Sequence, residues 1–226
     1  MLRFLLRGLP FLAAVLPTGQ APACNSDSGI VLIPNPQVDA KLAAAPGQEK
    51  MVVAGGCFWG IQAVFQHLRG VISATSGYSG GSATNATYEA VCSGRTGHAE
   101  AVQVLYDPSQ ITYGRLLQVH FSVGHDPTQL NRQGPDTGTQ YRSAIFYTSE
   151  EQRQIAQAYM DQLNRAKVFA KPIATQLAPL EVFYPAEDYH QDYAAQHPEN
   201  MYIVVHDLPK VANLRQQFPE LFIEKK

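Results

Sequence analysis

The stretch that decides the fold is KMVVAGGCFWGIQAVFQHLRG, residues 50–70. It opens with a short aliphatic run at 50–54, which predicts a strand, and continues through two glycines into Cys57. Large apolar side chains then recur at helical spacing, and Gly70 is placed to end that helix. These apolar side chains are Phe58, Ile61, Val64, Phe65 and Leu68. The segment therefore predicts a strand, a tight turn and a helix, with a cysteine at the start of the helix.

The position of Cys57 favours a reactive thiol. Free N–H groups and the partial positive charge at a helix N-terminus stabilise a thiolate, which is the nucleophilic form of cysteine. The alternative is a small buried residue on an amphipathic helix, a common setting for a free cysteine. Phe58 and Trp59, the only tryptophan, follow directly. They either shape an apolar pocket beside the cysteine or belong to the core.

Strand and helix patterns alternate along the rest of the chain. Strands are predicted at 71–78, 99–106, 142–147 and 173–184. Helices are predicted at 112–120, 149–167, 188–197 and 210–217. Residues 125–140 show no periodicity and predict a long loop, and long loops in compact domains are often functional. The alternation indicates an α/β or α+β fold with helices packed on a sheet.

The bulk composition indicates one globular domain with a tail. The chain has 226 residues, of which 45% are hydrophobic and 16% charged, enough apolar material for a core. The net charge of −2 is spread along the chain, so no basic face predicts nucleic-acid binding. Three cysteines without a CxxC pair predict that any functional cysteine acts singly.

The N-terminal segment predicts export. Residues 1–23 carry two early arginines, a short apolar run at 11–16 and a small-x-small cleavage pattern, as in a signal peptide. The apolar run is far shorter than the ~20 residues that span a bilayer. Cys24 follows directly and offers a site for a lipid anchor. We therefore expect an exported protein, periplasmic or membrane-anchored by lipidation at Cys24, or a cytoplasmic one if this segment is not a signal. Residues 24–48, rich in Pro, Ala and Gly, predict a flexible linker before a catalytic domain at 49–226.

Several strings, taken in order, resemble the A-type peptide methionine sulfoxide reductase family. They are GGCFWG at 55–60, GYSGG at 77–81, TYE at 87–89, VCSG at 91–94, TGHAE at 96–100, HDP at 125–127, the run at 132–142 and FYPAEDYHQ at 183–191. Together they cover most of residues 51–200. The resemblance implies a two-layer sandwich of helices on a mixed β-sheet, a ferredoxin-type plait, which agrees with the alternation of strands and helices.

The resemblance also implies an activity. It is the thiol-dependent reduction of methionine S-sulfoxide, in peptides and also as the free amino acid, which repairs oxidised proteins. Cys57 matches the cysteine that attacks the sulfoxide sulfur and becomes a sulfenic acid. Phe58 and Trp59 match the aromatic pair that holds the S-methyl group. The preference for the S epimer is implied only by the resemblance and cannot be predicted from the residues themselves.

Three further residues match positions around the sulfoxide oxygen, and a fourth matches a residue that organises the site and the thiolate. The resemblance places Tyr88, Glu100 and Tyr141 beside the oxygen and gives Asp136 a role in organising the site. A sulfoxide is a poor electrophile until its oxygen is protonated. Glu100 therefore needs a pKa raised by burial among aromatic side chains, and the phenols can donate hydrogen bonds as negative charge builds on the oxygen. Without the resemblance, Glu100 would be interpreted as an ordinary ion-pair partner on a strand, and Tyr88 and Tyr141 as packing residues.

Regeneration of Cys57 departs from the pattern of many relatives, which use cysteines in a Gly-rich C-terminal tail. This chain has no cysteine after Cys92. The resemblance implies no bound cofactor and an external reductant, a thioredoxin-like domain or another thiol. Cys92 is a possible resolving cysteine, because it lies between two matched motifs, and Cys24 is a third option. An exported enzyme would need a dedicated electron supply in its oxidising compartment.

Two other functions remain open at this stage. One is a cysteine hydrolase or acyltransferase that pairs Cys57 with His98, His125 or His190. The other is a protein that binds oxidised methionine without turning it over. The matching positions of the three histidines suggest structural hydrogen bonds, and their spacing fits no standard zinc pattern. The expected partners are oxidised proteins or peptides and a thioredoxin-like reductant, and a monomer is the default assembly.

Overall fold

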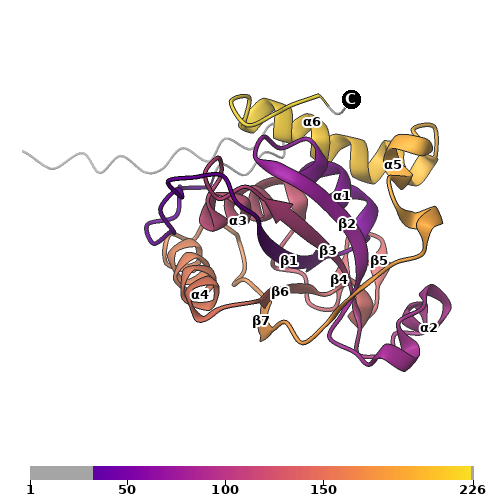
Figure 1. The fold of residues 1–226 in the computed structure, drawn as a ribbon. Helices are drawn as coiled ribbons and strands as arrows, with labels where there is room; N and C mark the ends of the chain where they lie inside the picture. Colours follow the sequence, from indigo (N-terminus) through magenta and orange to yellow (C-terminus); the bar gives the residue numbers. More distant parts are fainter. Residues whose placement is uncertain (1–32, 225–226) are drawn as a thin grey trace, which may run out of the picture.

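The fold is built on a six-stranded mixed sheet, seen in a computed structural model that describes residues 33–224. The strand order is β7-β6-β1-β3-β2-β8, and neighbours are antiparallel except β6 and β7 (Figure 1). The strands are β1 (Glu49–Gly55), β2 (Val71–Ser79), β3 (Ala99–Tyr106), β6 (Ser143–Tyr147), β7 (Gln176–Pro179) and β8 (Phe183–Pro185). A separate hairpin joins β4 (Arg132–Gln133) to β5 (Asp136–Thr137).

The helices give the sheet its connections. The α-helices are α1 (Phe58–Gln66), α2 (Tyr88–Cys92), α3 (Tyr113–Val119), α4 (Glu150–Arg165), α5 (Tyr193–Gln196) and α6 (Leu208–Gln217). Short 3-10 turns are η1 (Ala83–Asn85), η3 (Thr139–Tyr141) and η4 (Asp188–His190), and π-helical turns are η2 (His120–Gly124) and η5 (Ile203–Asp207). Because α1 follows β1 and α3 follows β3, the central strands β6-β1-β3-β2 form a βαββαβ plait. The predicted fold class is therefore confirmed.

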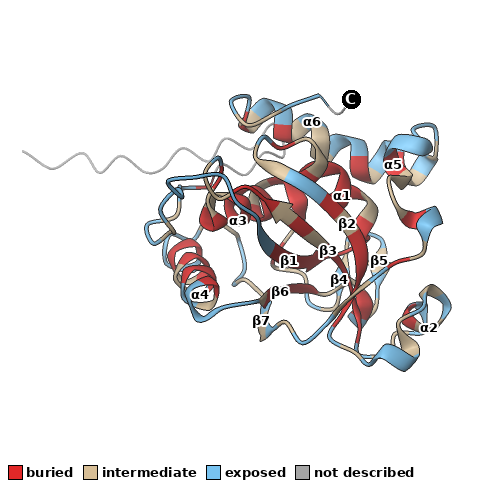
Figure 2. Cartoon of the chain, in the orientation of Figure 1, coloured by how far each residue is buried: buried red, intermediate tan, exposed pale blue. Residues whose placement is uncertain are grey.

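The two faces of the sheet are covered by apolar clusters of different size. Along β1, Met51 and Val53 enter the main core with α1, α3 and α4, whereas Val52 and Ala54 join a smaller apolar cluster on the opposite face. This split follows from the alternation of side chains along a strand. Phe183 packs against the smaller cluster. Figure 2 shows the burial concentrated in the central strands and the inner sides of the helices.

Some predicted elements differ in the structure. The long loop predicted at 125–140 contains the β4–β5 hairpin, and its end forms the 3-10 turn η3. The strand predicted at 173–184 is divided into β7 and β8, which lie at opposite edges of the sheet. The helix predicted at 188–197 is broken at Asp192, whose φ of 57° is left-handed. Helical backbone runs from 201 to 217, longer than the predicted final helix.

The linker prediction needs a correction for residues 33–48. Ile33 is buried, and Asp39 accepts hydrogen bonds from the Thr112 hydroxyl and from the Gly114 N–H at the start of α3. This segment therefore packs on the domain. The Asp39 carboxylate holds it there by accepting hydrogen bonds from donors at the start of α3. The predicted signal peptide and Cys24 lie outside the described residues. Within residues 33–224, no helix is long and apolar enough to span a membrane.

Candidate active site

The turn between β1 and α1 requires its glycines. Gly56 has a φ of 97°, which favours glycine, and a Cβ there would lie 2.6 Å from the side chain of Gln133. A Cβ on Gly55 would lie 2.6 Å from the ring of His125. The closely packed turn brings Cys57 to the N-cap of α1, where the sequence places it.

A small cavity of about 200 Å³ lies beside Cys57. Its walls come from α1, α2, β3, the β4–β5 hairpin, η3 and the helical segment near the C-terminus. The side chains that line it are Cys57, Phe58, Trp59, Tyr88, Glu100, Asp136, Tyr141 and Tyr202. The structure thus brings together in one cavity seven of the eight candidate residues, from segments as far as 84 positions apart in sequence (141 minus 57).

The eighth lining residue, Tyr202, has no counterpart among the predicted site residues. Its hydroxyl donates a 2.5 Å hydrogen bond to Oδ2 of Asp136, and its ring meets Trp59 edge-on at 6.0 Å. Burial raises the pKa of Tyr202, and the Cys57 sulfur and the Asp136 carboxylate add to the shift, so its hydroxyl remains a neutral donor. Tyr202 lies beyond the matched motifs, and no sequence pattern marks it. Only the approach of the C-terminal segment to α1 reveals it.

Glu100 is a buried carboxyl group at the floor of the site. It is 2% exposed, and its Oε2 accepts a hydrogen bond of 3.1 Å from the N–H of Phe58. Burial raises the pKa of Glu100 to about 8; the Phe58 N–H opposes this shift, and the Asp136 carboxylate adds to it. Glu100 therefore carries a proton at neutral pH, as a general acid requires.

The electrostatics of Cys57 correct the expectation that its helix position alone yields a thiolate. The pKa of Cys57 is raised well above its ordinary value, first by burial and then by the carboxylates of Glu100 and Asp207. The Trp59 N–H at the helix start and the Lys210 ammonium act in the opposite direction. Because desolvation outweighs these two contributions, the resting cysteine is a thiol that shares its cavity with a protonated acid.

Glu187 holds Tyr88 at the wall of the cavity. Its Oε1 accepts from the Tyr88 N–H at 2.9 Å, and its Oε2 accepts from the Tyr78 hydroxyl at 2.8 Å. The carboxylate thus binds the start of α2 to the sheet. Burial raises the pKa values of both Tyr88 and Tyr141, so their hydroxyls remain hydrogen-bond donors.

The three matched histidines form hydrogen bonds to other groups. The Trp59 Nε1–H donates to Nδ1 of His190 at 3.3 Å. His98 Nε2 lies 3.0 Å from the Ser82 carbonyl, and His125 Nε2 lies 2.6 Å from the Ser143 hydroxyl. In the described residues none of these rings is hydrogen-bonded to Cys57, so the structure offers no cysteine–histidine pair for hydrolase chemistry.

The second described cysteine lies at the edge of the site. Cys92 is exposed at the end of α2, the helix that begins at Tyr88, whose side chain lines the cavity. It is not itself a lining residue. Over residues 33–224, no group of three or more His, Cys, Asp or Glu side chains is arranged to hold a metal ion.

Comparison with known sequences points to one family. The family model for peptide methionine sulfoxide reductase matches residues 49–221. A peptide methionine sulfoxide reductase MsrA 2 of Mesorhizobium japonicum is 60% identical over 182 residues, which cover 80% of this chain and 93% of the relative. A protein of the same name from Synechocystis is 53% identical and covers 84% of this chain and 89% of the relative.

Solved structures give the same result for the fold. The methionine sulfoxide reductase A of Corynebacterium diphtheriae superposes with a TM-score of 0.58 at 40% identity, covering 74% of this chain and 84% of its own. The reduced form of Mxr1 from Saccharomyces cerevisiae gives a TM-score of 0.61 at 32% identity, covering 73% and 92%. The matched part of each structure includes most of the residues that the structure of this chain describes.

Proposed function

The chain belongs to the peptide methionine sulfoxide reductase family, and we propose that Cys57 is its nucleophile, Glu100 its proton donor and methionine S-sulfoxide its substrate. One observation carries the proposal: a cysteine at a helix start and a buried carboxyl group with a pKa of about 8 line the same small cavity. The aromatic rings of Phe58 and Trp59 in that cavity suit an S-methyl group. The chain is therefore an enzyme that reduces oxidised methionine.

The residues support a balanced reaction. The Cys57 sulfur attacks the sulfoxide sulfur while Glu100 protonates the oxygen, and Tyr88, Tyr141 and Tyr202 donate hydrogen bonds as charge builds there. The S–O bond of the sulfoxide and the transient bond between the two sulfurs then break, and the oxygen becomes bonded to the Cys57 sulfur. Methionine leaves, Cys57 is left as a sulfenic acid, and the proton of the original thiol replaces the one that Glu100 donated. The sulfoxide gains two electrons and the cysteine sulfur loses two. Two external thiols then return the cysteine, forming one disulfide and one water.

Turnover of separated S and R epimers of a peptidyl methionine sulfoxide, with dithiothreitol as the reductant, tests this proposal. We expect reduction of the S epimer alone. Free S-sulfoxide of methionine is assayed in parallel, because the cavity is small enough to hold the side chain without contacts to a longer peptide. No turnover of either epimer by folded protein would contradict the proposal, and turnover of R alone would contradict the assigned stereochemistry.

We also propose that an external thiol, either a thioredoxin-like protein or a small thiol, regenerates Cys57 directly. Support comes from the cysteines of the chain: none follows Cys92 in the sequence, and Cys92 is not among the residues that line the cavity. The alternative is that Cys92 attacks the sulfenic acid first. Oxidised proteins and peptides are the proposed substrates, and a monomer without a bound cofactor is the proposed working form.

Cys92→Ser separates the two regeneration routes. We expect thioredoxin-supported turnover to stay within about twofold of the unsubstituted chain, since a direct route does not need a second cysteine. Dithiothreitol-supported turnover of the same variant is the control, because it reports any damage to the neighbouring Tyr88. A loss of tenfold or more with thioredoxin, but not with dithiothreitol, would establish Cys92 as the resolving cysteine.

For location, we propose export through residues 1–23, with lipidation at Cys24 as the further possibility. The support is the arrangement of arginines, apolar run and small residues in the sequence. The intact mass of the chain recovered from cells checks this. A mass lacking the first 23 residues supports export, an added lipid mass supports anchoring, and an unprocessed chain favours the cytoplasm.

A further inference from the structure

A buried ion pair lies against the first turn of α1. Asp207 is 0% exposed, and its Oδ1 accepts a hydrogen bond of 3.1 Å from Nζ of Lys210, whose side chain is 17% exposed. A Cβ on Gly60 would lie 2.1 Å from that Oδ1 and 2.8 Å from that Nζ. Both charges therefore touch the helix backbone within one turn of Cys57.

From this contact we propose that Asp207 and Lys210 are positioning residues, which set the charge at the N-terminal turn of α1 and thereby the fraction of Cys57 present as thiolate. The inference rests on the proposed function, in which Cys57 is the nucleophile. It adds two residues that lie outside the cavity lining and outside every matched motif. They act through the helix start and not by touching the substrate.

The placement of Asp207 is costly for stability, which indicates another role. Its second oxygen, Oδ2, is buried without a hydrogen-bond partner among the described residues. Burying a carboxylate costs free energy that one ammonium partner does not fully offset, so such pairs contribute little net stability. Asp207 also ends the π-helical turn Ile203–Asp207, and π-helical turns in otherwise α-helical segments occur frequently at functional sites.

The two charges act on Cys57 with opposite signs. The Asp207 carboxylate raises the pKa of the thiol, and the Lys210 ammonium lowers it. Glu100 is the other charged group that raises it. The remaining titratable groups that line the cavity or pack beneath the turn and around the pair are Tyr88, Asp136, Tyr141, Tyr202, His120, His125 and His206. Lys210 also acts on the pKa values of His120 and His125, and Asp207 acts on that of Tyr202, so the test must report on the Cys57 thiol itself and not on overall activity.

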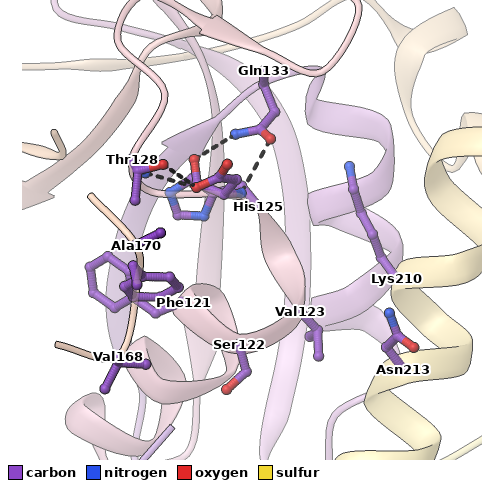
Figure 3. Close-up of a pocket in the computed structure, with 12 residues that line it drawn as sticks. Phe121, Ser122, Val123, His125, Thr128, Gln133, Val168, Ala170, Lys210 and Asn213 are labelled. Atoms are coloured by element: carbon purple, nitrogen blue, oxygen red, sulfur yellow. Dashed lines mark hydrogen bonds between the residues drawn. The ribbon is translucent and has the colours of Figure 1, made fainter. Parts of the chain in front are cut away.

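Lys210 is the partner of a fully buried carboxylate, so removing its charge lowers stability, and Lys210→Met is checked for a native fold before it is compared with Lys210→Arg. Figure 3 shows it extending from α6 along the wall of a second cavity, of about 450 Å³, which His125 and Gln133 also line. These two residues pack on Gly55 and Gly56, the turn that precedes Cys57. The ammonium therefore approaches the turn before Cys57 from the side opposite the small cavity. A methionine in place of Lys210 has a similar length and shape but no charge.

The test is the pH dependence of Cys57 alkylation by iodoacetamide in the full chain without substrate, followed by mass spectrometry of the Cys57 peptide. We expect Asp207→Asn to speed alkylation at pH 7 by about fivefold to tenfold and Lys210→Met to slow it by a similar factor. Lys210→Arg, which keeps the charge, is the matched control and should stay within about twofold. The double variant should return close to the unsubstituted rate, since the two effects oppose each other.

The opposite signs separate this proposal from a structural role, because loss of packing would move both variants in the same direction. Shifts of the same sign, or no shift in either variant, would overturn the proposal. If Asp207→Asn fails to fold, Lys210→Met against Lys210→Arg decides: slower alkylation in the methionine variant alone supports it, and equal rates overturn it. Because no substrate is present, a failure here is distinct from a failure of the sulfoxide reaction.

Discussion

We expect replacement of Cys57 with serine to abolish reduction of the S-sulfoxide, with kcat lower by at least about a thousandfold. A serine hydroxyl at this position is nearly isosteric, so the cavity and the hydrogen bond from the Phe58 N–H to Glu100 remain. The hydroxyl, however, is a far weaker nucleophile than sulfur, and it cannot become a sulfenic acid. The measurement is steady-state reduction of the peptidyl S epimer at saturating substrate, with dithiothreitol as the reductant.

Two observations complete that experiment. Cys92→Ser is the matched cysteine control, and with dithiothreitol we expect it to retain activity, because Cys92 lies outside the cavity lining. A probe for sulfenic acid should label Cys57 after one turnover without reductant and should label no residue in Cys57→Ser. Retention of a tenth or more of the activity in Cys57→Ser would show that the nucleophile has been misassigned.

We expect Glu100→Gln to lower kcat by about 10²- to 10⁴-fold, the contribution typical of a positioned general acid. The amide keeps the oxygen that accepts from the Phe58 N–H, so the fold of the turn is preserved. It cannot deliver a proton to the sulfoxide oxygen. In the unsubstituted enzyme, activity should fall as pH rises through about 8, because Glu100 loses its proton there. This falling limb should be absent from the residual activity of the variant.

The same substitution should have the opposite effect on the reactivity of the thiol. The Glu100 carboxylate raises the pKa of Cys57, so its removal lowers that pKa and increases the thiolate fraction above pH 8. We therefore expect Glu100→Gln to react faster with iodoacetamide while it turns over more slowly. A variant that is slower in both assays would indicate a disturbed site, and one that keeps normal turnover would exclude Glu100 as the acid.

The sequence alone was sufficient for the parts of this protein that depend on local order. The aliphatic run, the two glycines and the helical spacing from Phe58 onward predict β1, the turn and α1, and the structure confirms them. A glycine with a left-handed φ and a cysteine at a helix start are consequences of a few neighbouring residues. The matched motifs added the residues around the sulfoxide oxygen, which the local pattern leaves as ordinary strand and loop positions.

Only the tertiary structure decided the features that depend on segments meeting across the chain. Tyr202, Asp207 and Lys210 reach the α1 turn because the C-terminal helical segment folds back onto it, and no local pattern in 201–217 records that contact. The protonation state of Cys57 also could not be predicted from the sequence. A helix start favours a thiolate, but burial and two carboxylates, one from β3 and one from η5, raise the pKa of Cys57 instead. Desolvation is a property of the packed cavity, so it arises only when distant segments exclude water together.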